Sequence, residues 1–219
     1  LSLKPPRYME TMKQDMAGAA VVLAVCKIAA ELKLNFHIIG VIPTVENMPG
    51  PKSYRPDDIV KFFNGKTAEI NNTDAEGRVI LADGLAYAET FKPQRIIDLA
   101  TLTGACVVAL GYWATGLMTK DDILAKDLTQ AGEETGDRVW RLPLWEEYFE
   151  NMKSDIADVR NCGKGHDAGT IEGAVFLSHF VKNTPWAHLD IAGTAFWNEP
   201  KFYNPKGATG AGVRLLVKY

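Results

Sequence analysis

The chain has 219 residues, of which 47% are hydrophobic and 23% charged, so it can build one substantial core and is expected to form a single domain. A net charge of −3 argues against nucleic acid as the main partner, and the longest uncharged apolar run, residues 16–26, is shorter than the roughly 20 residues that a membrane span needs. The three cysteines (Cys26, Cys106 and Cys162) form no CxxC pair, which indicates free thiols in a reducing, cytosolic compartment.

The chain begins with residues 1–4, which alternate like the end of a strand, and Pro5-Pro6 then stops the strand pattern. Lys4 is therefore a cation near the end of an extended segment, although a surface lysine is the more usual occurrence. Because Leu1 replaces an initiator Met, we expect this start to be a cleavage, a truncation or an incomplete boundary, not a natural N-terminus.

Residues 9–34 have helical periodicity and are apolar on nearly every face, which predicts a buried helix that approaches a sheet closely through its small residues. Asp15 falls in the first turns, where the helix dipole favours a carboxylate. Its functional interpretation is a ligand that faces the same cleft as the acidic motif described below. Residues 36–42 are a continuous apolar run, typical of a strand buried on both faces, and His37 is expected to be a core histidine.

Asn64-Gly65-Lys66-Thr67 is better explained as a hairpin turn than as a phosphate-binding loop, because Val60 stands where the first glycine of such a loop is needed. The heptapeptide 72–78, Asn-Thr-Asp-Ala-Glu-Gly-Arg, follows it. In an extended segment Asp74, Glu76 and Arg78 would project to one side, and two such carboxylates suit a divalent metal. The alternative is a solvated turn with a chance ion pair.

The remaining elements alternate between helices and strands. We expect helices over 79–91, 121–135, 144–159 and 171–181, an aspartate cap at 121, and buried strands over 95–100 and 186–191. Trp145, Tyr148 and Phe149 are expected to pack inward, and 106–110 to be extended. The loop 101–104 follows a strand's carboxyl end, where open α/β sheets bind ligands. The sequence thus predicts an α/β fold with a mixed, largely parallel central sheet covered by helices on both faces.

At this point the sequence resembles one family, the dinuclear-metal leucine aminopeptidases or cytosol aminopeptidases. The heptapeptide is identical to that family's signature, and the resemblance covers essentially the whole chain. Further blocks that match are 3–5, 12–16, 46–49, 100–105, 136–141, 186–193 and 206–207.

The resemblance implies a role for each matching position. Asp15, Asp74 and Glu76 would bind two divalent ions (Zn or Mn, with Mg or Co as further options), and Glu76 would bridge them. Arg78 would hold a bicarbonate that acts as the general base, and Lys4 would polarise the scissile carbonyl. The pocket for the substrate's first side chain would be lined by Met12, Thr101, Leu102, Gly104, Ala192 and Ala195.

The resemblance also implies two further ligands, a lysine and an aspartate, in a Gly-rich segment that in the family ends just before Leu1. Neither they nor the family's N-terminal domain are in this sequence, so a chain truly beginning at Leu1 should bind metal poorly and be nearly inactive. The function implied is removal of N-terminal residues from peptides by a cytoplasmic homohexamer. Two alternatives stay open: a catalytically silent scaffold or DNA-binding architectural subunit of the same fold, and another dinuclear hydrolase such as a phosphatase.

Overall fold

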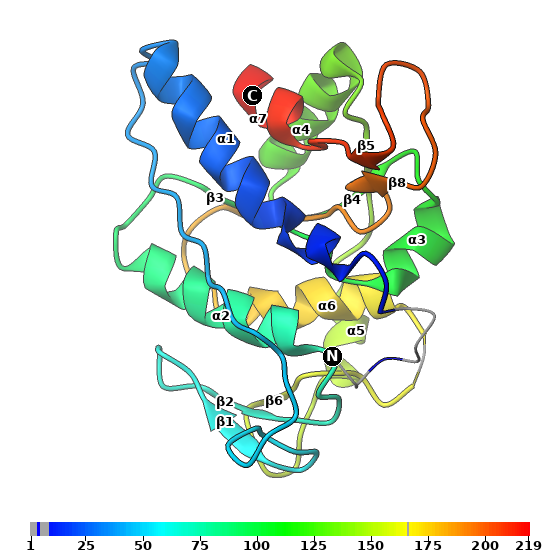
Figure 1. The fold of residues 1–219 in the computed structure, drawn as a ribbon. Helices are drawn as coiled ribbons and strands as arrows, with labels where there is room; N and C mark the ends of the chain where they lie inside the picture. Colours follow the sequence, from blue (N-terminus) through cyan, green and yellow to red (C-terminus); the bar gives the residue numbers. More distant parts are fainter. Residues whose placement is uncertain (1–3, 5–8, 166) are drawn as a thin grey trace. The chain divides into compact units, whose positions relative to one another are not determined.

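The computed structural model describes residue 4 and residues 9–165 and 167–219. The predicted strand end at residues 1–3 lies outside the described residues. The chain divides into two compact units (Figure 1): the first contains residues 1–12, 43–96 and 144–184, and the second contains 13–42, 97–143 and 185–219. Both units combine helices with strands, so the predicted α/β class is confirmed.

The helices are η2 (a 3₁₀ helix, Met12–Met16), α1 (Ala17–Glu31), α2 (Glu76–Glu89), α3 (Gly104–Leu110), α4 (Asp122–Thr135), α5 (Glu147–Glu150), α6 (Gly169–Ser178) and α7 (Val213–Lys218). The strands are β1 (Ile59–Lys61), β2 (Thr67–Glu69), β3 (Ile96–Ala100), β4 (Thr115–Met118), β5 (Val139–Arg141), β6 (Val159–Arg160), β7 (Trp186–Asp190), β8 (Phe196–Trp197) and β9 (Gly207–Ala208). None of the helices in the described part of the chain is both long and apolar enough to cross a membrane.

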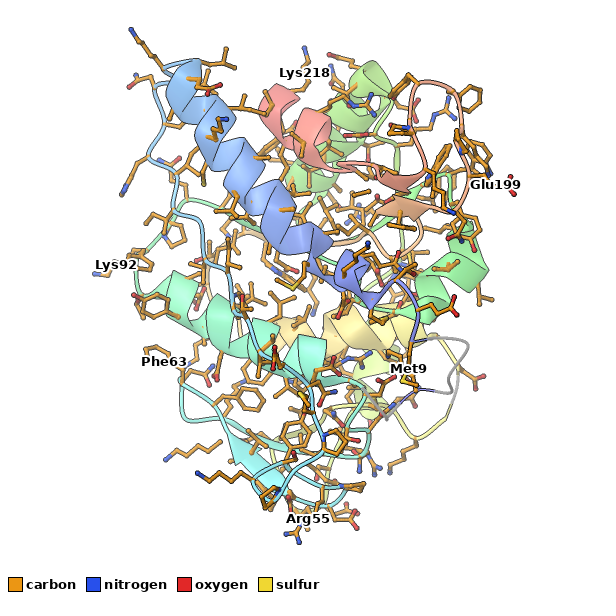
Figure 2. All side chains as sticks on the ribbon, in the orientation of Figure 1. Met9, Arg55, Phe63, Lys92, Glu199 and Lys218 are labelled. Atoms are coloured by element: carbon orange, nitrogen blue, oxygen red, sulfur yellow. The ribbon has the colours of Figure 1, made fainter. Side chains whose placement is uncertain are left out.

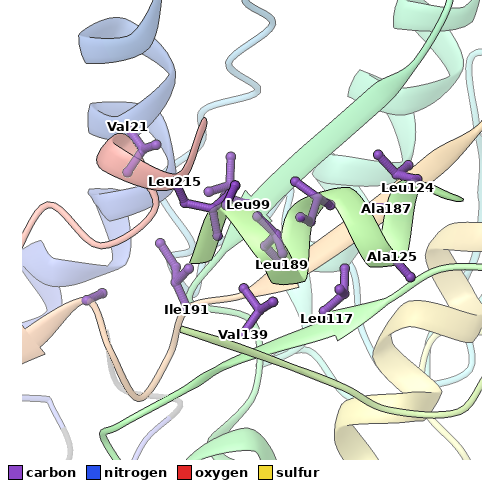
Figure 3. Close-up of a cluster of buried hydrophobic side chains, with 13 residues drawn as sticks. Val21, Leu99, Leu117, Leu124, Ala125, Val139, Ala187, Leu189, Ile191 and Leu215 are labelled. Atoms are coloured by element: carbon purple, nitrogen blue, oxygen red, sulfur yellow. The ribbon is translucent and has the colours of Figure 1, made fainter. Parts of the chain in front are cut away.

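The second unit is built on a four-stranded sheet in the order β3-β7-β4-β5. Strand β4 runs parallel to β5 and antiparallel to β7, so this sheet is mixed. Apolar side chains of the sheet, including Leu117 and Leu189, meet Val21 of α1, Leu124 of α4 and Leu215 of α7 in one buried cluster (Figure 3). Burial of this cluster supplies the main hydrophobic stabilisation of the unit.

Helix α1 approaches β3 closely, as its small residues predicted. A Cβ added to Gly18 would lie 2.2 Å from the carbonyl oxygen of Leu99, so only glycine fits there. The expectation that this helix is buried all round is wrong, because only Gly18, Val21 and Ala29 are buried and Leu23 is 63% exposed. Its apolar character exceeds what its packing against β3 and α7 covers.

The predicted strand 36–42 is also absent from the described structure. The segment has no regular secondary structure and pairs with no strand among the described residues, and Phe36 is 76% exposed. His37 is likewise exposed, so the expectation of a core histidine is wrong. Gly40 lies directly against α1, where an added Cβ would be 2.9 Å from Val22, so the segment is held by the helix and not by a sheet.

The first unit contains a three-stranded sheet in the order β1-β2-β6. Strands β1 and β2 form the predicted hairpin, with Gly65 in its turn at a φ of 88°, where a side chain would be strained. Beneath the hairpin, the rings of Phe62 and Phe180 lie 4.4 Å apart, next to Phe176 of α6. Phe63, the next residue, instead points outward and is 60% exposed (Figure 2).

Two further predictions need correction. Residues 106–110 belong to helix α3, because Thr103 caps it by accepting a hydrogen bond from Cys106 N at 3.1 Å. The expected helix over 144–159 shrinks to α5, and Trp145 is 64% exposed instead of packed inward. The aspartate cap is confirmed, since Asp121 accepts a 2.8 Å hydrogen bond from Leu124 N.

Candidate active site

The heptapeptide 72–78 forms a turn followed by the first turn of α2, not the extended segment that the sequence predicted. Asn72 starts the turn: its side-chain oxygen accepts from Asp74 N at 2.8 Å, and its carbonyl accepts from Ala75 N at 3.3 Å. Helix α2 then begins at Glu76, where the helix dipole favours a carboxylate. Residues two apart on a helix do not face each other, so the predicted alternation that aligned Glu76 with Arg78 is wrong.

The structure brings Lys4 onto this turn. Its ammonium nitrogen lies 2.7 Å from Asp74 Oδ1 and 2.6 Å from Oδ2, and the two side chains are 28% and 34% exposed. Both residues were predicted site residues, and they are separated by 70 positions in the chain. The first unit thus pairs the predicted catalytic lysine with a predicted metal ligand.

Arg78 is buried, with 8% of its surface exposed. Its Nη1 donates to the carbonyl oxygen of Asn161 at 2.9 Å and lies 3.7 Å from the sulfur of Cys162. Burial raises the pKa of the Cys162 thiol, and the nearby Arg78 charge opposes that rise. The guanidinium is therefore held in one orientation by the chain that follows β6.

Glu76 lies near the side chain of Tyr54. Burial raises the pKa of the Tyr54 hydroxyl to about 12, and the negative charge of Glu76 contributes to the rise. The hydroxyl oxygen of Tyr54 is buried and makes no hydrogen bond within the described residues. The site of the first unit thus contains a phenol that stays protonated beside a carboxylate.

Asn161 is a residue of this site that the sequence did not reveal. It is fully buried, its side-chain oxygen accepts from the backbone N–H groups of Asn71 (2.7 Å) and Asn72 (3.2 Å), and its amide donates to Asn72 O at 2.7 Å. Together with its carbonyl bond to Arg78, it fixes both ends of the heptapeptide. No local signal marks it, because its partners lie about 90 positions away in the chain.

The second unit contains Asp15 and the loop 101–104. The hydroxyl of Thr101 donates to Asp15 Oδ1 at 2.6 Å, which joins the predicted ligand to a predicted pocket residue. Leu102 and Ala192 are half-buried and Gly104 is exposed at the start of α3, whereas Ala195 is 2% exposed within the hydrophobic core. Met12, the remaining predicted pocket residue, begins η2 and belongs to the first unit.

The donor types present suit a divalent cation, because Asp15, Asp74 and Glu76 all offer carboxylate oxygens. Asp74 and Glu76 belong to the first unit, and Asp15 belongs to the second. Over residues 4, 9–165 and 167–219, no three His, Cys, Asp or Glu side chains gather in a group that could hold a metal ion. The three-residue ligand set therefore stays a prediction.

Comparison with known proteins identifies the class and then the family. The fold is similar to that of leucine aminopeptidase-type structures: tomato leucine aminopeptidase (mutant K354E) matches with a TM-score of 0.86 at 46% identity, over 94% of this chain and 40% of that one. The model of the cytosol aminopeptidase family, catalytic domain, matches residues 1–217. The chain belongs to the cytosol aminopeptidase family.

Two further relatives show the extent of the similarity. A probable cytosol aminopeptidase of Geobacter sulfurreducens is 58% identical over 219 residues, which are 100% of this chain and 44% of that protein. The structure of the bottromycin maturation enzyme BotP in complex with Mn matches with a TM-score of 0.94 at 43% identity, over 100% of this chain and 49% of that one. The chain therefore spans less than half the length of these relatives.

Proposed function

We propose that the protein is a metal-dependent exopeptidase that releases N-terminal amino acids from peptides, with broad specificity and a preference for aliphatic residues such as leucine. One observation of the structure carries the proposal: the ammonium of Lys4 lies 2.6 Å from the carboxylate of Asp74, within the motif that contains Glu76. Membership of the family supplies the class of reaction.

The acidic residues Asp15, Asp74 and Glu76 are proposed to hold two divalent ions, with Zn and Mn as the first candidates. Such ions, when bound, polarise a carbonyl and lower the pKa of a water molecule toward neutrality. BotP, whose structure is 43% identical to this chain in sequence, was determined in complex with Mn, which makes Mn the first metal to test.

Lys4 is proposed to donate a hydrogen bond to the oxygen of the scissile carbonyl. Its contact with Asp74 shows that the ammonium reaches the acidic motif, and it would turn from that carboxylate to the substrate oxygen once Asp74 binds a metal ion. A donor held close to this oxygen stabilises the negative charge that develops on it. A single preorganised donor of this kind is typically worth about 3–4 kcal/mol in the transition state.

Arg78 is proposed to bind bicarbonate as the general base. A guanidinium binds a planar anion through two parallel hydrogen bonds, and it keeps its charge at any physiological pH. The bond from Nη1 to Asn161 O orients the planar group, so the anion would be held in a defined place.

Thr101, Leu102, Gly104 and Ala192 are proposed to line the pocket for the first side chain of the substrate, with Met12 and Ala195 as further family positions. These side chains are small or apolar, and an apolar pocket discriminates by only about 1–3 kcal/mol per methylene. Broad specificity follows. A cytoplasmic location and a homohexameric assembly are proposed on the resemblance to the family alone.

The test is hydrolysis of leucine anilide by the protein in its natural length, measured while Mn or Zn is titrated. We expect metal-dependent release of the anilide, and we expect Glu76→Gln to abolish it without changing the far-UV circular dichroism. Glu133→Gln is the matched control, because Glu133 is a helical carboxylate with 63% of its side chain exposed. Normal turnover in folded Glu76→Gln, or DNA binding without any peptidase activity, would overturn the proposal.

A further inference from the structure

Asp190 is a completely buried carboxylate at the end of β7. Strand β7 lies beside β3, and both strands end at the same edge of the sheet, since Ile191 N donates to Ala100 O at 2.9 Å. Two loops leave the sheet at this edge: residues 101–104 after β3 and residues 191–195 after β7. Asp190 is therefore placed between the two segments that carry most of the proposed pocket residues.

One carboxylate holds both loops. Asp190 Oδ1 accepts from Leu102 N at 3.1 Å, from Thr103 N at 3.5 Å and from Ala192 N at 3.1 Å. Its other oxygen, Oδ2, accepts from the hydroxyl of Thr103 at 2.7 Å. A single oxygen atom thus bonds backbone N–H groups of both loops. The Asp190 side chain therefore links the two loops at this point, next to the main-chain hydrogen bond from Ile191 N to Ala100 O.

The contacts continue beyond the carboxylate. Thr103 also caps α3 by accepting from Cys106 N, and Thr101, two residues earlier, donates to Asp15 Oδ1 at 2.6 Å. A shift of the loop 101–104 would therefore move the first turn of α3 and the partner of a proposed metal ligand. Asp190 also contacts the first turn of α3 directly, because its carbonyl oxygen accepts from the thiol of Cys106 at 3.5 Å.

Burying a carboxylate costs free energy, because removing a charge from water is unfavourable and an apolar side chain would pack at least as well. The cost at Asp190 is offset by four hydrogen bonds from the two loops. The four donors come from both loops and converge on the two oxygens of one side chain, so this side chain holds the backbone of both loops.

We propose that Asp190 is a positioning residue that sets the shape of the pocket for the substrate's first side chain, by tying loop 101–104 to loop 191–195. The inference rests on the proposed peptidase function, because the pocket has meaning only if an N-terminal residue binds there. It assigns no contact between Asp190 and the substrate.

The chain offers a matched control in Asp98. This residue is also a buried aspartate on the same sheet, and its carboxylate pairs with His188 Nδ1 at 2.5 Å and Trp186 Nε1 at 2.6 Å. These partners lie on the neighbouring strand β7 and not in either loop. Asp98→Asn therefore reports the general effect of neutralising a buried acid in this sheet.

The experiment compares the natural-length protein with Asp190→Asn, Thr103→Val and Asp98→Asn. The amide of Asp190→Asn keeps one acceptor oxygen but places a donor opposite the Thr103 hydroxyl, and Thr103→Val removes that hydroxyl at nearly constant shape. For each, kcat and KM are measured on leucyl, alanyl and phenylalanyl anilides. We expect Asp190→Asn and Thr103→Val to change the leucyl-to-alanyl ratio of kcat/KM by roughly tenfold, and Asp98→Asn to leave it within about twofold.

Amide hydrogen exchange gives a second measurement that needs neither metal nor activity. Faster exchange confined to 101–104 and 191–195 in Asp190→Asn supports the inference, and exchange no faster than in Asp98→Asn overturns it. An active parent whose substrate ratio is unchanged in Asp190→Asn and Thr103→Val overturns the inference alone. A parent without peptidase activity instead overturns the proposed function and the pocket role with it, while exchange still decides whether Asp190 holds the loops.

Discussion

Gly18→Ala is the substitution whose effect follows most directly from the geometry. The added Cβ would lie 2.2 Å from Leu99 O and 3.1 Å from Leu99 C, both backbone atoms that no side-chain rotation can move. Real Cβ contacts essentially never fall below 3.0 Å, so α1 and β3 must separate by about 1 Å. Asp15 lies three residues before Gly18, and Thr101 lies two residues after Leu99, so the same separation would disturb their 2.6 Å hydrogen bond.

The expected change in the free energy of unfolding is the difference between two opposing effects. Forcing an extra methyl group into a well-packed contact costs about 1–3 kcal/mol, and the upper end applies where the obstacle is backbone. Replacing a helical glycine by alanine returns about 0.5–1 kcal/mol through reduced backbone entropy in the unfolded chain. The net prediction is a loss of about 1–2 kcal/mol.

Urea denaturation followed by circular dichroism measures this loss, provided that the dependence on urea keeps the same slope. Gly104→Ala is the control, because Gly104 is also a helical glycine of the same unit, the first residue of α3. A Cβ added to Gly104 would meet no atom within 4 Å. That variant should be as stable as the parent or more stable. Equal stability of Gly18→Ala and the parent would refute the close approach of α1 to β3.

Three further predictions concern the first unit. Lys4→Met should lower kcat on leucyl anilide by about 10²–10³-fold with little change in KM, because it removes the donor that we propose acts in the transition state. Asn161→Ala should lower the free energy of unfolding by roughly 3 kcal/mol, since it removes three side-chain hydrogen bonds of about 1 kcal/mol each. Hydrogen bonds from Ser154, and then from Asn71, lower the pKa of the Glu69 carboxyl below its ordinary 4.5. These bonds therefore stabilise the folded protein above pH 4.5, and this stabilisation is lost as the pH falls through the lowered pKa. In Ser154→Ala, the free energy of unfolding measured in urea should therefore fall less between about pH 6 and about pH 3 than it does in the parent.

Each of these predictions has a control in the same chain. Lys27→Met, at a lysine whose side chain is 75% exposed, should leave kcat unchanged, and an unchanged kcat in Lys4→Met would remove that residue from the mechanism. Asn64→Ala removes one 3.1 Å hydrogen bond in the hairpin turn, and an equal loss in both asparagine variants would contradict a special role for Asn161. Ser178→Ala removes a hydroxyl that donates to Val175 O at 2.7 Å and to no carboxylate among the described residues, so this variant should keep the parent's acid dependence of stability.

The helices and strands that the sequence predicted correctly are those whose causes are local. The capped helix α4, the hairpin at Gly65 and the buried strands β3 and β7 each follow from a cap, a turn residue or an apolar run within a few positions. The failures share another cause. The segment 36–42 and helix α1 are apolar enough to be buried. Their hydrophobicity shows that burial would be favourable, but it does not show which other part of the protein could cover them.

The candidate site likewise has residues that the sequence predicts and contacts that it does not. The amino-acid sequence by itself identifies Asp74, Glu76 and Arg78, through the heptapeptide and its resemblance to aminopeptidases, because those residues are close neighbours in the chain. The contact of Lys4 with Asp74, the clamp of Asn161 on the heptapeptide and the four bonds of Asp190 were decided by tertiary structure alone. Their partners lie about 70 to 90 positions apart, and a hydrogen bond acts over about 3 Å, so only the folded backbone can determine which distant polar groups meet.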